Sequence, residues 1–236
     1  RAWDQTTGSA STTGSPSTAD ASTHGGTSAF STGVASATLA VAAVNDAPTV
    51  TNGASTALPG TDEDTVSATT SVAALLAASG HADVDTAALS GIAVTAVTAN
   101  GAWQYSTDAG TTWTAFGPVA ANAALLLDAA TLLRYQPDGA NGETASFSYR
   151  AWDQTTGSAS TTGSPSTADA STHGGTSAFS TGVADATLVV NAVNDAPTIT
   201  NGASTALPGT DEDTASASTS VAALLAASGH ADLDAG

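Results

Sequence analysis

The chain has no cysteine, no methionine and no lysine, and arginine supplies all 3 of its basic residues. Without cysteine, neither a disulfide framework nor a thiolate metal site can form. Because 21 acidic residues stand against these 3, the formal net charge is -18, which argues against nucleic acid and anionic membrane surfaces as partners. The same charge suits a divalent cation or a saline environment.

Catalytic and membrane-spanning signatures are also missing. The 236 residues contain no G-x-S-x-G, no H-E-x-x-H, no phosphate-binding loop and no apolar run long enough to cross a bilayer. The 4 histidines occur in two sequence contexts, THGGT and GHAD, which are more typical of solvated loops than of metal ligands. We therefore expect a protein that is not an enzyme and that has no membrane insertion in this segment.

An internal duplication is the strongest positive feature. Residues 1–87 return at 150–236 without a gap and with nine differences, so the repeat unit is 149 residues long. A period of this length matches a whole domain, whereas solenoid units span roughly 20–50 residues. Because the first residue corresponds to the middle of a strand-like run, we expect the chain to be an excerpt from a longer array. The expected domains are the C-terminal part of a preceding repeat (1–44), one complete repeat (45–193) and the N-terminal part of the next (194–236).

The apolar residues alternate with polar ones over several short runs, which is the period of a β-strand. Hydrophobic residues make up 41% of the chain, too many for plain disorder. The residues expected to share a face are Phe147, Tyr149 and Ala151 in one run, Leu188, Val190 and Ala192 in a second, and Ile92, Val94 and Ala96 in a third. Several such runs bounded by Gly, Pro, Asn and Asp predict an all-β fold, an antiparallel β-sandwich in each repeat.

Two segments depart from the strand pattern. The run SVAALLAAS (71–79) predicts one short helical turn. The stretch rich in serine, threonine and glycine at 155–182 predicts a long insertion before the last strand, with Phe179 pinning a small hairpin inside it.

The stretch STDAGTTW (106–113) fits the S-x-D-x-G-x-T-W pattern of the Asp-box, which is familiar from sialidases. Its residues predict a hairpin in which Asp108 accepts hydrogen bonds from the turn, Gly110 supplies an unusual backbone angle and Trp113 packs back. A sialidase needs an arginine cluster for its substrate carboxylate, and the chain has only three separate arginines. A structural role is therefore favoured.

Acidic and amide residues gather where strand-like runs end. The motif VNDAP holds Asn45 and Asp46 with their copies Asn194 and Asp195, TDEDT holds Asp62, Glu63 and Asp64 with copies at 211–213, and ADVD holds Asp83 and Asp85 with copies Asp232 and Asp234. Asp153 follows the aromatic run. Side chains two apart in an extended segment point the same way, and Ca²⁺ takes 6–8 oxygen ligands, so this pattern favours calcium.

The whole unit resembles the cadherin-like repeats of large bacterial surface adhesins that are secreted by type I systems and often carry RTX repeats. VNDAPT resembles their inter-domain linker, DEDT their early acidic motif, DVDTAALSG the cadherin D-x-D segment, and LRYQPDGANGETASFSYRAWD the tyrosine-containing strand with its trailing aspartate. The RTX nonapeptide itself is absent from these residues, and NGE stands where the family has a paired acid beside Glu143.

The resemblance implies Ig-like or cadherin-like β-sandwich domains in tandem, with Ca²⁺ bound at each junction. At the first junction it implies ligands from Asn45, Asp46, Asp83, Asp85 and Asp153. At the second it implies ligands from Glu63, Glu143, Asn194, Asp195, Asp232 and Asp234. The implied protein is an extracellular cell-surface extender for adhesion and biofilm formation. Its partners are the neighbouring repeats, with a cell-surface or matrix ligand bound through other domains.

Two other interpretations remain open at this point. The chain could be a repeat subunit of an extracellular filament, sheath or surface layer, in which case lateral self-assembly could use the insertion at 155–182. The acids could also be only a solvated surface in a saline habitat, with N-D-x-P acting as a turn signal. Turn chemistry alone does not predict the D-x-D pair far from the linker.

Overall fold

The computed structural model describes residues 1–234, and the chain divides into two compact units, Arg1–Ala43 and Val44–Gly236. The expected N-terminal part of the next repeat, 194–236, is therefore described up to residue 234. No helix in the described part of the chain is long and apolar enough to cross a membrane. Each unit is treated by itself below.

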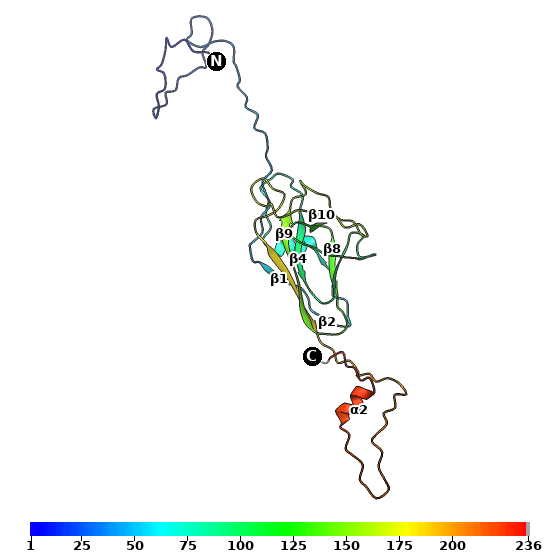
Figure 1. The fold of residues 1–236 in the computed structure, drawn as a ribbon. Coiled ribbons are helices and arrows are strands. Elements are labelled where there is room, and N and C mark those ends of the chain that lie inside the picture. The colour runs from blue at the N-terminus through cyan, green and yellow to red at the C-terminus, as the bar shows by residue number, and fades with distance from the viewer. Residues whose placement is uncertain (235–236) are drawn as a thin grey trace. The chain divides into compact units, whose positions relative to one another are not determined.

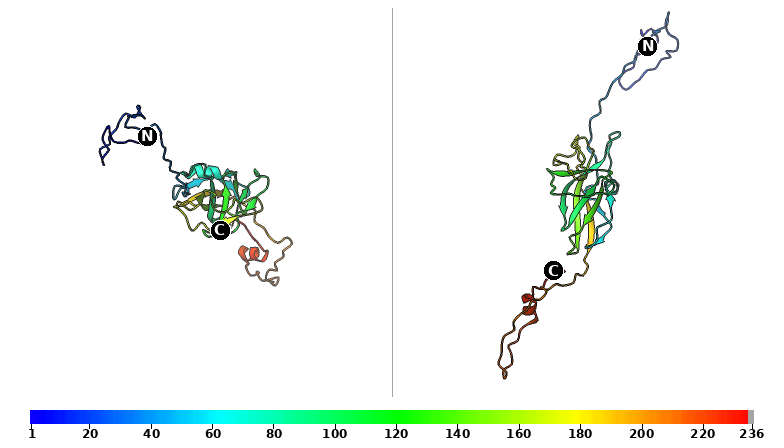
Figure 2. Two further views of the ribbon diagram at one scale, coloured as in Figure 1. Left: turned by 90° about the horizontal axis from the view of Figure 1, so that it is seen from above. Right: turned by 90° about the vertical axis from the view of Figure 1, so that its right-hand side faces the viewer.

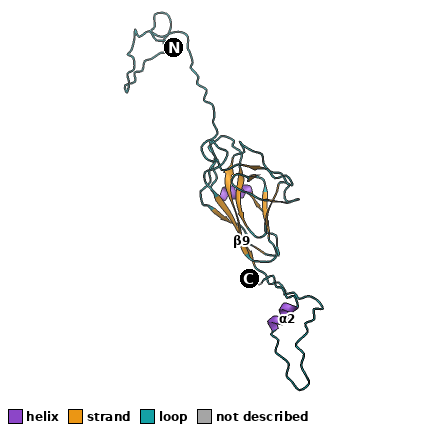
Figure 3. Ribbon diagram, in the orientation of Figure 1, coloured by secondary structure: helices purple, strands orange, loops and turns teal. Residues whose placement is uncertain are grey.

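The second unit is built from two β-sheets and two short helices (Figures 1 and 3). The larger sheet has the strand order β1-β11-β9-β4-β7-β10, with β2 also paired to β11, and the smaller has the order β3-β8-β5-β6. The strands are β1 (Ser55–Ala57), β2 (Thr61–Asp62), β3 (Thr70–Ser71), β4 (Gly91–Thr98), β5 (Ala102–Ser106), β6 (Thr114–Ala115), β7 (Ala124–Asp128), β8 (Leu132–Gln136), β9 (Glu143–Trp152), β10 (Thr167–Ala168) and β11 (Ala184–Asn191). The helices are α1 (Val72–Ala78) and α2 (Val221–Ala227).

The prediction of a β-rich, mainly antiparallel fold is confirmed. The exceptions are β1 and β2, which both pair in parallel with β11. Figure 2 shows this two-sheet body, residues 50–191, from two further directions. Because β1 and β2 come first in the repeat and β11 comes last, these parallel pairs join the two ends of the repeat in one sheet.

An aromatic cluster joins the two sheets. Trp103 on β5 lies 4.8 Å from Phe147 on β9, measured between ring centroids, and the rings meet edge to face at 79°. Tyr135 on β8 lies 5.0 Å from Trp103, and Phe116 lies 5.5 Å from Phe147. All four are at most 5% exposed. Such aromatic pairs stabilise a fold beyond the burial of their area.

The expected strand faces hold with two corrections. Phe147, Tyr149 and Ala151 share the buried face of β9, as predicted. The expectation for Ala96 is wrong, because a β-bulge between Val94 and Ala96 shifts the register and leaves Ala96 exposed. The expectation for Ala192 is also wrong, since β11 ends one residue earlier and Ala192 is exposed.

The predicted helical turn is confirmed as α1. Ser71 caps its N-terminus by accepting a hydrogen bond from the Ala74 N–H at 3.2 Å. The side chains of Val72, Leu75 and Leu76 are at most 3% exposed, and Figure 3 shows α1 lying among the strands. Helix α2 has the same sequence and the same serine cap, yet it has no buried residue, and residues 194–234 contain no strand.

The insertion at 155–182, here called the strap, is folded against the outer face of the larger sheet. Its β10 pairs with β7, and Leu126 on β7 exchanges backbone hydrogen bonds of 2.9 and 3.0 Å with Ser160 and Ser166. A second apolar cluster fills the contact, and its members are Ala93, Ala124, Leu126, Trp152, Ala170, Ala178 and Phe179. Because both faces of β7 are covered, its leucines form a continuous buried run.

The local structure of the strap recurs in the first unit. Trp152 forms an isolated antiparallel bridge with Phe179, and Trp3 forms the same bridge with Phe30. The indole N–H of Trp152 donates to the Thr156 carbonyl at 2.8 Å, and the corresponding bond in the first unit is 2.7 Å. Phe179 thus bridges to the end of β9 and closes a turn with Gly174, in place of the small hairpin predicted inside the insertion, and the first unit makes this turn without a sheet of its own among its residues.

The Asp-box forms the predicted hairpin between β5 and β6. Asp108 accepts hydrogen bonds from the Ser106 hydroxyl at 2.7 Å and from the Thr112 N–H at 3.0 Å. Gly110 has φ +85°, and the Trp113 indole donates to its carbonyl at 3.0 Å. The guanidinium of Arg134 stacks on Trp113 at 4.2 Å. Every special residue of the motif is thus used for the turn itself.

Replacing Asp108 with alanine is expected to lower the melting temperature by a few degrees at neutral pH, because the turn loses its acceptors. Hydrogen bonds from Ser106 and Thr112 lower the pKa of Asp108 from 3.8 to about 2. A lowered carboxyl pKa stabilises the fold above the unfolded value and loses this effect as the pH falls through the folded value. Thermal melts of both proteins from pH 7 to pH 2 should therefore converge toward pH 2. A difference that does not change with pH would contradict this account.

Candidate metal centre

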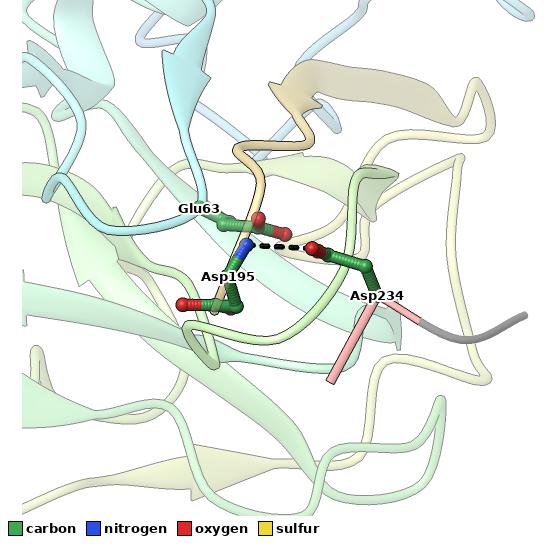
Figure 4. A group of neighbouring side chains, drawn as sticks. All are labelled: Glu63, Asp195 and Asp234. Carbon is green, nitrogen blue, oxygen red and sulfur yellow. Dashed lines mark hydrogen bonds between the residues drawn. The ribbon is translucent and has the colours of Figure 1, made fainter. Parts of the chain in front are cut away.

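Three carboxylates from distant parts of the sequence meet beside the second VNDAP linker (Figure 4). Glu63 follows β2, Asp195 belongs to the linker, and Asp234 belongs to the second ADLD motif. Their ligand oxygens all lie within 4.8 Å of one another. We call these three residues the second-linker group.

Glu63 is the unusual member of this group because it is only 1% exposed. Its Oε1 accepts a hydrogen bond from the Val193 N–H at 2.6 Å, whereas its Oε2 is buried and has no hydrogen-bond partner. A buried carboxylate oxygen without a donor costs free energy that a cation in contact with it would offset. Glu63 is thus the buried member of the group, whereas Asp195 is half-buried and Asp234 is exposed.

The rest of the second-linker group is arranged around the linker backbone. The Asp195 N–H donates to Asp234 Oδ2 at 2.6 Å, and the Oδ2 of Asp195 is buried without a partner. Desolvation raises the pKa of Asp195, and repulsion from Asp234, Asp64 and Asp232 raises it further. The negative charges of three neighbouring acids thus act together on the Asp195 carboxylate.

The residues predicted for the first junction also lie together, and we call them the first-linker group (Asn45, Asp46, Asp83, Asp85 and Asp153). The Asn45 amide donates to Asp153 Oδ2 at 2.9 Å, and the Asp46 N–H donates to Asp85 Oδ2 at 2.8 Å. The Asp85 N–H donates to Asp83 Oδ1 at 2.9 Å. Within residues 1–234, however, only the second-linker group brings three carboxylates into mutual reach.

The two linkers have the same local geometry. The bond from Asp46 to Asp85 recurs as the bond from Asp195 to Asp234, and the bond from Asp85 to Asp83 recurs between Asp234 and Asp232 at 3.1 Å. An isolated bridge joins residues 49 and 82, and its copy joins 198 and 231. The linker and the D-x-D motif therefore form one local substructure, which residues 194–234 reproduce without a sheet.

Of the remaining ligands predicted for the second junction, Glu143 is engaged elsewhere, whereas Asn194 and Asp232 make local hydrogen bonds beside the group. Glu143 accepts a short hydrogen bond from the Tyr135 hydroxyl and another from the Asn100 N–H at 2.8 Å, so its carboxylate is directed at the turn before β5. The Asn194 amide donates to the Asp195 carbonyl at 3.0 Å, and Asp232 accepts from the Asp234 N–H. The structure thus brings Glu63, Asp195 and Asp234 together and keeps Glu143 out of their group.

Sequence analysis missed two contributions to these groups. Asp64 acts on Asp195 through its charge, and its place in DEDT was a usable signal. The carbonyl oxygens of Thr176 and Ser177 lie 3.4 and 3.5 Å from the Asn45 amide nitrogen. Nothing in the strap sequence pointed to those backbone atoms, because any residue carries a carbonyl group.

Comparison with known proteins gives no relative from which a role could be transferred. No protein-family model, no curated protein sequence and no solved structure matches the chain.

Proposed function

We propose that the chain is a calcium-stiffened extender segment of an extracellular surface adhesin, with cadherin-like sandwich repeats in tandem. The observation that carries the proposal is the buried Glu63, whose free Oε2 belongs to the same group as Asp195 and Asp234. Glu63 belongs to the complete repeat, and the two aspartates belong to the next one. A cation held by all three would tie consecutive repeats together.

Electrostatics supports a cation at this position. The three basic residues are Arg1, Arg134 and Arg150, and within residues 1–234 none of them makes an ion pair with the second-linker group, so no arginine neutralises its carboxylates there. Like charges at this spacing repel, and a divalent ion reverses the sign of the interaction. Calcium is favoured over magnesium because Ca²⁺ accepts irregular shells of 6–8 oxygens, whereas Mg²⁺ demands a tight octahedron.

The repeat relation allows the two groups to be combined into one junction. Asp195 and Asp234 correspond to Asp46 and Asp85, so Glu63 of one repeat would join the full first-linker set of the following repeat. That set adds the equivalents of Asn45, Asp83 and Asp153 as further oxygen donors. The combined set is large enough for the coordination number of Ca²⁺.

A mechanical role follows from this junction. The sequence has no catalytic motif. The polar residues of its recognisable motifs form turns and helix caps, such as Asp108 in the hairpin and Ser71 at α1. Ions that tie repeat to repeat would hold a distal adhesive domain away from the cell, at the cell surface and in biofilms. The extender is favoured over the filament alternative because Ala178 and Phe179 of the strap cover its own sheet rather than a neighbouring chain.

Calcium is expected to raise the melting temperature of the chain, because an ion that binds only the folded state stabilises it. At 100-fold excess over its dissociation constant, one ion adds about 2.7 kcal/mol. Thermal melts in calcium, in magnesium and in chelator test this, and magnesium should rescue poorly. Melts that are identical in calcium and chelator would contradict the proposal.

A matched pair of variants locates the ion. Glu63→Gln is expected to abolish most of the calcium-dependent gain while leaving the melt in chelator unchanged or higher, because it removes a buried charge. The control is Glu212→Gln, the same residue of the repeated DEDT motif, which is exposed. If Glu212→Gln reduced the calcium response as much as Glu63→Gln, the ion would not sit at the second-linker group.

A further inference from the structure

One loop of the strap, residues 172–177 with the sequence THGGTS, lies against the first linker. The Ala47 N–H donates to the Gly175 carbonyl at 2.7 Å. The Asn45 amide nitrogen lies 3.4 and 3.5 Å from the carbonyl oxygens of Thr176 and Ser177. The strap therefore contacts the linker on both sides of Asp46, through its backbone.

The end of the strap holds the chain that follows the linker. Gly182 is packed so closely on Val50 that an added Cβ would lie 2.4 Å from the Val50 carbonyl oxygen. One residue further, the Val183 N–H donates to Asn52 Oδ1 at 3.1 Å and the Val183 carbonyl accepts from the Gly53 N–H at 2.8 Å. Gly182, Val50 and Asn52 line a groove of about 510 Å³ together with linker residues 46–48 and with Gly174 and Gly175 of the loop.

The loop is itself fixed to the larger sheet. The Gly174 N–H donates to the Phe179 carbonyl at 2.8 Å, and Phe179 is 3% exposed in the second apolar cluster. The Arg150 guanidinium binds the carbonyls of Ser180 and Thr181 at 2.8 and 2.7 Å. A continuous set of hydrogen bonds and buried contacts thus runs from β9 through the strap to the linker.

We propose that the strap is a linker clamp, which fixes the course of residues 45–48 through protein contacts alone, before any cation binds. These contacts join backbone groups and uncharged amides, so they do not need an ion. The role of the clamp would be to hold the first-linker group in the arrangement that binds the cation, and this role rests on the proposed function. A linker that is already ordered does not lose conformational entropy when the cation binds, so binding is more favourable.

The second linker is an internal reference for this proposal. The Asn194 amide, the copy of Asn45, donates only to the neighbouring Asp195 carbonyl within the described residues. Ala196, the copy of Ala47, makes no backbone hydrogen bond to a strap there. The same seven residues, AVNDAPT, are therefore clamped at one place in the chain and unclamped at another.

Amide hydrogen exchange in chelator tests the clamp on the full chain. NMR is used because it resolves the single amides of Ala47 and Ala196, which lie in the identical stretch AVNDAPT. The Ala47 amide should exchange at least about tenfold more slowly than the Ala196 amide. Gly182→Ala should remove this difference, because its Cβ displaces the strap from Val50. The control Gly33→Ala changes the copy of Gly182, around which a Cβ would meet nothing within 4 Å, and should leave the Ala47 rate unchanged.

A milder pair of variants covers the case in which Gly182→Ala fails to fold. Asn52→Ala removes the acceptor of the Val183 N–H on an exposed residue and should speed Ala47 exchange, whereas Asn201→Ala, its copy, should not. Ala47 protection that occurs only in calcium would overturn the clamp, even if calcium raises the melting temperature. Protection in chelator with no calcium effect on melting would support the clamp and overturn the cation proposal.

Discussion

Trp152→Ala is expected to lower the free energy of unfolding of the two-sheet body by about 3–5 kcal/mol. Trp152 is fully buried and is the largest side chain of the cluster between the larger sheet and the strap. Its removal leaves a cavity there, and it also leaves the Thr156 carbonyl without the indole donor. Because the cluster holds the strap, hydrogen exchange of the strap amides should increase more than that of the aromatic core.

The control for this variant is Trp3→Ala, which changes the copy of the same residue in the first unit. Trp3 makes the same indole hydrogen bond, to the Thr7 carbonyl at 2.7 Å, yet it is only partly buried. Its replacement should change the unfolding of the two-sheet body by less than about 0.5 kcal/mol. Denaturant titrations of both variants measure the difference. Equal losses of unfolding free energy would show that the packing of Trp152 on the larger sheet does not stabilise the fold.

Leu75→Ala is expected to destabilise the same body by about 2–5 kcal/mol. Leu75 in α1 is fully buried in the main core, and its carbonyl accepts a hydrogen bond from the Tyr149 hydroxyl at 3.2 Å. Alanine is a good helix former, so the loss comes from the cavity rather than from helix propensity. The expected result is a lower denaturation midpoint with an unchanged slope.

Leu224→Ala is the matched control, because α2 repeats the sequence of α1. Leu224 is partly exposed and belongs to no apolar cluster among the described residues. We expect a change within about 0.5 kcal/mol in the same titration. A large loss in Leu224→Ala would mean that α2 packs on the two-sheet body in solution.

Local features of the fold were predictable from neighbouring residues. The serine cap and apolar spacing of SVAALLAAS identified α1, and Asp108, Gly110 and Trp113 identified the hairpin, because caps and turns are satisfied within a few residues. The alternation of Phe147 and Tyr149 identified the buried face of β9. Ala96 was misplaced because a bulge depends on the pairing of β4 with β9, which is a long-range property.

The packing of the strap on the larger sheet could not be predicted from neighbouring residues. Its serine, threonine and glycine residues gave no periodic signal, and yet Phe179 and Trp152 hold it on the larger sheet. A loop of this composition is ordered only if a partner surface satisfies its backbone groups, and β7 supplies that surface through Leu126. The position of the strap could be predicted from the sequence, but the sheet face that the strap covers could not.

The amino-acid sequence by itself determined the repeat, the β-rich class, the excess of negative charge and the set of acids at the linkers. Only the tertiary structure decided which acids meet. Glu63 and Glu212 stand in identical DEDT motifs, yet Glu63 is buried beside Asp195 and Asp234 whereas Glu212 is exposed. The physical reason is that burial and charge repulsion depend on what the rest of the chain places around a carboxylate, and a motif specifies only the carboxylate itself.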